Sequence, residues 1–266
     1  MKYLSLFAIS AVSLAMSAGI ASAQTIDFDQ AGDTAGFTTD RFAPDGFTSG
    51  VVDGSRTVLV QSIDVSDGAN NRPGGFGGAF YNTQGMKSPV FDAGAQSMSV
   101  ELFVGSDWAE TGRRMAGFWG EGVDGAMSVV SYPIIEYSSD ALYGFGDGWR
   151  GYDPTQVATN GWVNLGGTVN YNGWNLLNIS LNGANWDYSV NGQYLASVGA
   201  NGSTSLKNAI LQGHNTTGGV SYDIKWDNLS SPGVVPEPGT WALMIIGFGG
   251  TGAMLRNRRR TLVLAA

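Results

Sequence analysis

Polar and apolar residues alternate over short segments in the middle and later parts of the chain. Ser97 to Val104 alternates residue by residue, and Trp174 to Leu181 and Tyr222 to Leu229 do so nearly as regularly. A period of two is typical of a strand with one buried face. Between residues 24 and 231 no segment shows the sustained 3.6-residue period of an amphipathic helix. The pattern therefore predicts many short strands.

Turn signals separate these runs. Asn182-Gly183 and Asn191-Gly192 each stand between alternating segments, and Asn-Gly favours the type I′ hairpin turn because both central residues need positive φ. A further strand is expected over Met127 to Tyr137, with an edge or bulge at Pro133 because proline cannot donate to a ladder. These features predict an all-β, antiparallel β-sandwich.

The first residues form an export leader. Lys2 is followed by the apolar run Leu4 to Ile20, and Ala21-Ser22-Ala23 precedes Gln24. A basic N-terminal region, an apolar segment and small residues before the cleavage site are typical of a signal peptide. Ala21, Ala23 and Gln24 mark the predicted cleavage site for signal peptidase. Residues 1–23 are therefore predicted as a signal helix, and the mature domain as residues 24–231.

The last residues, 232–266, combine a turn, an apolar run and a basic end. Trp241 to Leu255 contains no charge and would span roughly 22 Å as a helix, somewhat less than a hydrocarbon core of about 30 Å. Arginine side chains can reach back to the interface and absorb the shortfall. We expect a C-terminal transmembrane helix with a transient stay in the inner membrane, and a buried strand or core helix is the alternative. The arginines that would stop it on the cytoplasmic side are Arg256, Arg258, Arg259 and Arg260.

The same segment resembles the PEP-CTERM sorting signal in its PEPxxWA variant. The residues that match its motif are Pro236, Glu237, Pro238, Trp241 and Ala242. The resemblance implies an exported protein of a Gram-negative bacterium that an exosortase processes, in a family associated with extracellular polysaccharide and biofilm matrix. It says nothing about the activity of the preceding domain. The apolar residues 261–266 after the arginines depart from the usual pattern, in which the tail stops sooner.

The composition narrows the partners. Nine of the fourteen Lys and Arg residues and twenty-one of the twenty-two acidic residues lie in residues 24–231, which gives this domain a net charge of −12. No basic stripe exists to neutralise phosphates, so nucleic acid is excluded as an expected partner. The chain has no cysteine and one histidine, His214, which removes thiol chemistry and most imidazole-based constellations.

The later half of the domain resembles the laminin-G/concanavalin-like jelly roll. The resemblance rests on the strand Trp174 to Leu181, the turn Tyr188-Ser189-Val190-Asn191-Gly192 and the closing strand Tyr222 to Leu229. It implies that the first and last strands pair, with Thr25 to Phe28 beside Ile224 to Leu229. The expected fold is therefore a jelly roll flanked by an N-terminal signal helix and a C-terminal transmembrane helix, and a generic β-sandwich is the alternative.

Catalytic residues are hard to find in the sequence. Glycosidases need two carboxylates that flank one bond, and the jelly-roll glucanases carry two Glu around an Asp on one strand. No such stretch occurs, and the glutamates before the tail, Glu101, Glu110, Glu121 and Glu136, are widely spaced. The loop pair Asp107 and Glu110 and the isolated His214 read more simply as surface residues. The sequence therefore predicts no catalytic residues.

Aromatic residues crowd the middle of the domain, many beside glycine or aspartate. Flat rings in loops stack well on sugar faces, and nearby polar groups can bind hydroxyls. The alternative is that most of these rings fill the core of the sandwich. The candidates for glycan binding are Trp108, Trp149, Arg150 and Tyr152.

Acidic residues suggest one metal. Asp27, Asp29, Asp223 and Asp227 would converge if the terminal strands pair, and calcium takes several carboxylate and carbonyl oxygens. Asp27, Asp223 and Asp227 are the predicted ligands of a possible structural calcium, Asp64 to Gly68 is a second candidate loop, and solvated turn acids are the alternative. No cofactor is expected to be required.

Together these features predict an exported, exosortase-processed protein of the cell envelope or extracellular matrix. Its domain is expected to be non-catalytic and to bind glycan, possibly an extracellular polysaccharide, or to structure the matrix. The alternatives are a polysaccharide-active enzyme, hydrolase or lyase, with an unrecognised site, and a passive structural component.

Overall fold

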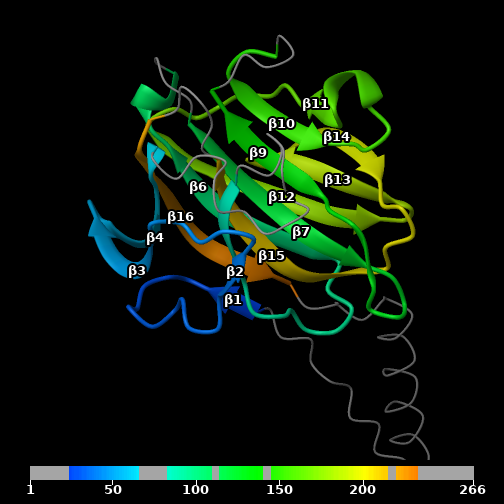
Figure 1. The fold of residues 1–266 in the computed structure, drawn as a ribbon, viewed down its shortest axis with the longest axis horizontal. Helices are drawn as coiled ribbons and strands as arrows, with labels where there is room; N and C mark the ends of the chain where they lie inside the picture. Colours follow the sequence, from blue (N-terminus) through cyan, green and yellow to red (C-terminus); the bar gives the residue numbers. More distant parts are fainter. Residues whose placement is uncertain (1–23, 66–82, 110–113, 140–144, 215–219, 233–266) are drawn as a thin grey trace, which may run out of the picture.

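The structure is a computed structural model that describes residues 24–65, 83–109, 114–139, 145–214 and 220–232. These residues form two antiparallel eight-stranded sheets that stack face to face (Figure 1). The predicted all-β sandwich of the jelly-roll type is therefore confirmed. Among the described residues no helix is long and apolar enough to cross a membrane. The expected signal helix (1–23) and membrane segment (241–255) lie outside the described residues.

The first sheet contains the terminal strands. Its order is β14 (Gln193–Gly199), β13 (Asn185–Val190), β12 (Gly173–Asn182), β6 (Ser97–Val104), β16 (Tyr222–Ser231), β4 (Arg56–Ile63) and β3 (Gly46–Asp53), with β1 (Gln24–Ile26) also paired to β16. Gln24 lies opposite Ser231 and Ile26 opposite Leu229. The expected pairing of the first and last strands is present, although β1 ends two residues before Phe28.

The second sheet is built from the middle of the chain. Its order is β11 (Trp162–Asn164), β10 (Gly148–Tyr152), β9 (Ile134–Ser138), β7 (Met115–Val123), β15 (Ser205–His214), β5 (Thr83–Lys87) and β2 (Thr38–Asp40), with β8 (Val129–Ser131) also paired to β7. Pro133 separates β8 from β9, so the interruption expected at this proline is observed. Two 3₁₀ turns complete the described elements, η3 (Ser106–Ala109) and η5 (Val157–Thr159).

The core lies between the sheets and follows the alternation in the sequence. In β6, Met98, Val100, Leu102 and Val104 are buried while the intervening residues are only partly covered. Strand β7 differs because all nine of its residues are buried. Phe118 belongs to the main core, whereas its neighbour Trp119 belongs to a second apolar cluster on the opposite side of the sheet. This outer face of the second sheet is therefore not an ordinary solvated surface.

Candidate functional site

Two rows of side chains cross the outer face of the second sheet. The aromatic row follows matched registers from Lys87 on β5 through β15, β7 and β9 to β10 and β11. Its members beyond Lys87 are Ile210, Trp119, Ile134, Tyr152 and Trp162. The polar row lies two residues away from the aromatic row on each of these strands and continues onto β2. It contains Asp40, Gly85, Gln212, Gly117, Glu136, Arg150 and Asn164. Strand pairing thus gathers residues from seven strands onto one face.

One end of the polar row is a buried ion pair. Arg150 Nε donates to Glu136 Oε1 at 2.6 Å, and Trp119 Nε1 donates to Glu136 Oε2 at 3.3 Å. The guanidinium lies 4.3 Å from the centroid of the Trp162 ring. Arg150 Nη1 is buried without a hydrogen-bond partner. Burying two charges costs several kcal/mol each before their attraction offsets it, so this arrangement carries a large desolvation cost.

The other end of the face is a carboxylate cluster, here defined as Asp40, Lys87 and Glu121. Lys87 Nζ lies 2.5 Å from Glu121 Oε1 and 3.5 Å from Asp40 Oδ1. Because both oxygens contact one ammonium, they can be at most about 6 Å apart, which overlaps the separation of about 5–5.5 Å in retaining glycosidases. The cluster is partly open, since the Lys87 side chain is 28% exposed.

The neighbours of Lys87 favour the charged form of its side chain. Burial lowers the pKa of Lys87, but the hydrogen bond and charge of Glu121 outweigh it, so the pKa is raised and the ammonium persists. Tyr132 stands at the margin, where burial and then the charge of Glu121 raise the pKa of its hydroxyl. Asp40 is further held by a hydrogen bond from Gln212 Nε2 at 2.5 Å and by an ion pair with Arg41 Nη2 at 2.8 Å.

Two positions of the polar row, Gly85 and Gly117, have no side chain and leave space for the side chains of neighbouring residues. A Cβ on Gly85 would lie 2.1 Å from Gln212 Oε1, and one on Gly117 would lie 2.4 Å from Trp119 Nε1. Larger residues there would displace the side chains that support Asp40 and Glu136. The glycines on β5 and β7 therefore make room for the polar side chains of the neighbouring strands.

The predicted glycan-binding residues divide between the two faces of the sheet. Trp108 and Trp149 are buried in the main core, where Trp149 Nε1 donates to Thr168 O at 3.1 Å. Their burial argues against stacking on a sugar face, and glycan binding by these two residues stays a prediction. Arg150 and Tyr152 lie on the outer face with the rows described above. The reason is strand alternation, since Trp149 points inward and its neighbours on β10 point outward.

The expected calcium ligands do not all converge. Asp27 and Asp227, with Asp29, line one cleft of about 300 Å³, but Arg56 also lines it and binds Asp227 Oδ2 at 3.0 Å. Asp223 lies four residues along β16 and is bonded to Ser62 instead. Among the described residues no three His, Cys, Asp or Glu side chains are grouped to hold a metal. Calcium binding at the Asp27–Asp227 cleft stays a prediction, and loop 64–68 lies mostly outside the described residues.

Other candidates have structural roles. Asp107 pairs with Arg114 at 3.1 Å, whereas Glu110 lies outside the described residues. His214 ends β15 with its backbone N–H donating to Tyr222 Oη at 3.2 Å. The residues that the sequence did not single out are Asp40, Lys87, Trp119, Glu121, Glu136 and Gln212.

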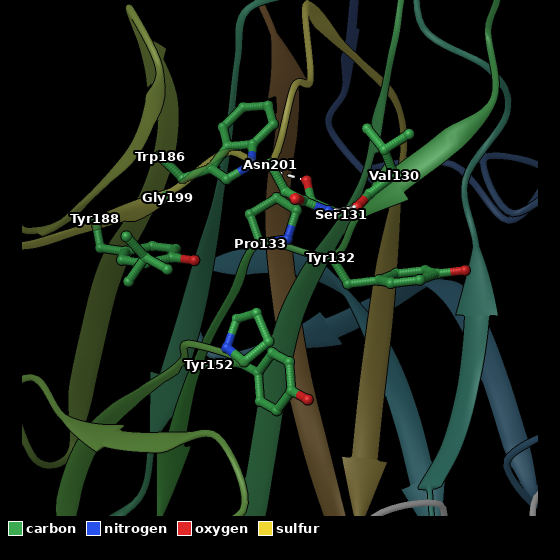
Figure 2. Close-up of a pocket in the computed structure, with 11 residues that line it drawn as sticks. Val130, Ser131, Tyr132, Pro133, Tyr152, Trp186, Tyr188, Gly199 and Asn201 are labelled. Atoms are coloured by element: carbon green, nitrogen blue, oxygen red, sulfur yellow. Dashed lines mark hydrogen bonds between the residues drawn. The ribbon is translucent and has the colours of Figure 1, made fainter. Parts of the chain in front are cut away.

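A pocket of about 190 Å³ opens at the margin between the sheets. Figure 2 shows Tyr132, Pro133 and Tyr152 on its second-sheet side, facing Trp186 and Tyr188 of β13. Tyr152 also belongs to the aromatic row, and Tyr132 borders the carboxylate cluster. The pocket is therefore adjacent to both features of the outer face.

Comparison with known proteins identifies the C-terminal segment and the fold. Residues 234–260 match the PEP-CTERM protein-sorting motif, which includes all the motif residues and arginines predicted above. The chain thus carries the sorting signal of an exported protein, although its coordinates lie outside the described residues. No curated protein matches the chain.

Solved structures share the sandwich at low sequence identity. A structure described under endo-acting O-glycanases of the human gut microbiota that initiate mucin breakdown has a TM-score of 0.52 and 10% identity, covering 80% of this chain and 99% of its own. A Crh5 transglycosylase in complex with NAG has a TM-score of 0.51 and 9% identity, covering 81% and 86%. At this identity the likeness establishes the fold.

These findings correct the prediction that the domain is not an enzyme. That prediction relied on the absence of a carboxylate pair along any one strand. The domain has the fold of enzymes that act on glycans, and Asp40 and Glu121 approach the same ammonium from separate strands.

Proposed function

We propose that this protein is an exported polysaccharide-active enzyme that cleaves or transfers glycosidic bonds at the carboxylate cluster. The observation that carries the proposal is that Asp40 and Glu121 both contact the Lys87 ammonium, which keeps these oxygens at most about 6 Å apart, a range that includes the roughly 5–5.5 Å of retaining glycosidases. The glycan-directed names of proteins with the same fold add support. Export follows from the sorting motif, with signal peptidase, the inner membrane and an exosortase as successive partners.

The two carboxylates differ in ways that suit different roles. Asp40 is oriented by Gln212 and Arg41 as well as Lys87, so it is the proposed nucleophile, attacking the anomeric carbon to form a glycosyl ester. Glu121 has only the hydrogen bond from Lys87 and a longer contact of 3.9 Å with Lys207 among the described residues, so it is the proposed acid that protonates the leaving oxygen. In the second step its carboxylate takes a proton from water or from a sugar hydroxyl. The oxygen of that molecule attacks the anomeric carbon, which breaks the glycosyl ester and restores both carboxyl groups.

Substrate entry requires Lys87 to move. The reacting bond would occupy the gap that its ammonium fills, and the flexible, partly exposed side chain can rotate toward solvent. Tyr152 in the aromatic row is only partly buried and would then offer a ring face to a sugar unit that flanks the bond. The location proposed for the working enzyme is the cell envelope or extracellular matrix.

The test measures bond cleavage and transfer by the full-length chain in detergent. Purified polysaccharides and mucin glycans are incubated with the protein, and both new reducing ends and the chain-length distribution are followed. Asp40→Asn and Glu121→Gln should each lower the rate by at least 10²-fold, since each removes one of the two groups that the reaction needs. Asp223→Asn, an acidic residue on the opposite sheet, is the matched control and should retain the rate. No turnover with any glycan, or equal rates in the variants, would refute the proposal.

A further inference from the structure

The pocket between the sheets has a mostly apolar lining. Val130 and Pro133 come from the second sheet, and Trp186 and Val198 come from the first. Its volume of about 190 Å³ is below the roughly 300–1,000 Å³ of pockets that hold drug-sized molecules. The space therefore suits one small substituent rather than a run of sugar units.

One hydrogen-bond donor in this lining is unused. The Tyr188 hydroxyl accepts from the backbone N–H of Ile134 at 3.2 Å, and among the described residues no atom accepts its own hydrogen. The Tyr188 side chain is fully buried, and Figure 2 shows its hydroxyl pointing from β13 toward Pro133. A buried donor without an acceptor costs free energy that a suitable ligand would recover.

Two other polar side chains at the pocket, Ser131 and Asn201, are already engaged, and Tyr132 and Tyr152, which carry hydroxyls, also line it. Ser131 Oγ accepts from Trp186 Nε1 at 3.0 Å and bonds with Ser203 Oγ at 2.7 Å. Asn201 Nδ2 donates to Val130 O at 2.7 Å. The edge of an unmodified sugar would bring several hydroxyls into this space and leave them short of partners, which is costly.

We propose that this pocket binds the acetyl group of an N- or O-acetylated sugar unit. The methyl group packs against Pro133 and Trp186, and the carbonyl oxygen accepts the hydrogen of the Tyr188 hydroxyl. An acetyl group presents one methyl and one strong acceptor, which matches an apolar pocket whose fully buried donor is the Tyr188 hydroxyl. Because Tyr132 borders both the pocket and the carboxylate cluster, the substituent is recognised beside the reacting bond. The inference rests on the proposed function for its substrate class.

The test uses two small neutral sugars, N-acetylglucosamine and glucose, which differ by the acetylated amine. Saturation-transfer NMR on the full-length chain in detergent should show binding of N-acetylglucosamine, with the strongest transfer to its methyl protons. Glucose should bind at least fivefold more weakly. The readout needs no turnover, so it is independent of the proposed reaction.

Val198 offers a way to fill the pocket. Its side chain faces the space between the sheets, is buried and lines the pocket, so a larger apolar residue there extends into that space. Val198→Phe should abolish binding of N-acetylglucosamine. Tyr188→Phe should weaken it about fivefold through the lost hydrogen bond. Val52→Phe is the matched control, since Val52 is 76% exposed on β3 and lies outside the pocket.

The outcomes separate the two proposals. Equal binding of both sugars, no binding of either, or unchanged binding in Val198→Phe would overturn the acetyl pocket, whatever the catalytic result. Selective binding without turnover of any glycan would support the pocket and overturn the proposed reaction.

Discussion

The outer faces of the two sheets carry the same kind of ion pair at different depths. On the first sheet, Lys225 Nζ lies 2.8 Å from Asp53 Oδ1, with side chains that are 30% and 35% exposed. On the second sheet, Arg150 Nε lies 2.6 Å from Glu136 Oε1, with side chains that are 4% and 5% exposed. The N–O distances of the two pairs are similar. The pairs differ in exposure, so solvent screens the charges of the first pair much more than those of the second.

The comparison indicates which face has a role beyond folding. A sheet needs one apolar face for its core, and the first sheet fits this rule with an outer face whose ion pairs each include a partner at least 30% exposed, although Asp227 beside Arg56 is itself 8% exposed. The second sheet buries charges on the face that needs none for packing. Such groups often decrease stability relative to apolar residues of similar size, so their presence fits a binding or catalytic role better than a purely structural one.

The largest expected effect comes from breaking the buried pair on one side. Glu136→Leu leaves the Arg150 guanidinium buried without its carboxylate, and removes the acceptor of Trp119 Nε1. The free energy of unfolding should fall by about 3–5 kcal/mol. Chemical denaturation monitored by tryptophan fluorescence measures the change.

The double variant Glu136→Leu with Arg150→Met tests the cause. Removing both charges should restore most of the lost stability, because the desolvation cost disappears with them. A double variant that is no more stable than Glu136→Leu would show that packing, rather than an unpaired charge, causes the loss.

A smaller effect is expected at the carboxylate cluster. Lys87→Met removes the cation that lies between Glu121 and Asp40, and stability at pH 7 should fall by about 1.5–3 kcal/mol. The pKa of Lys87 is raised in the folded state, so its contribution is fully present below the unfolded-state value of 10.5 and is lost as pH rises through the folded pKa. Denaturation at pH 7, 10 and above 11 gives the free energy of unfolding of both proteins. The difference between wild type and Lys87→Met should therefore decrease only at the most alkaline pH. A difference that disappears between pH 7 and 10 would contradict this account.

Trp119 should contribute less. Trp119→Phe keeps a ring in the aromatic row but removes the Nε1 donor to Glu136 Oε2. A loss of about 1 kcal/mol is expected from one hydrogen bond to a buried carboxylate. A change near zero would mean that Arg150 alone satisfies this carboxylate.

The sequence predicts the strands whose two faces differ. In β6 and β12 the apolar positions alternate with polar ones, and the Asn191-Gly192 turn has the positive φ values that its residue types favour. Strand β7 gives no such signal, because it is buried on both faces and three glycines interrupt its pattern. The pattern along the chain therefore reveals which strands have a solvated side and obscures the strand that carries Trp119 and Glu121.

The candidate site is harder to predict than the fold because its residues meet across strands. Asp40 and Glu121 are brought together by the pairing of β2, β5, β15 and β7, and no spacing within one segment records this. The choice of Trp149 and Arg150 from one glycine-rich run shows the same limit. Their side chains point to opposite faces of β10, and only the sheet determines which face is the core.

The smallest expected effect lies on the first sheet and tests the comparison directly. Lys225→Met removes the exposed pair with Asp53 and the contact of Nζ with the Phe103 ring, 5.2 Å from its centroid. Because water and salt screen this pair, the free energy of unfolding should change by less than about 1 kcal/mol, and less still at 1 M salt. The measurement is the same denaturation at low and high ionic strength. A loss above about 2 kcal/mol would place this pair in the same class as Arg150 and Glu136, and the contrast between the two faces would no longer point to the second sheet as the functional one.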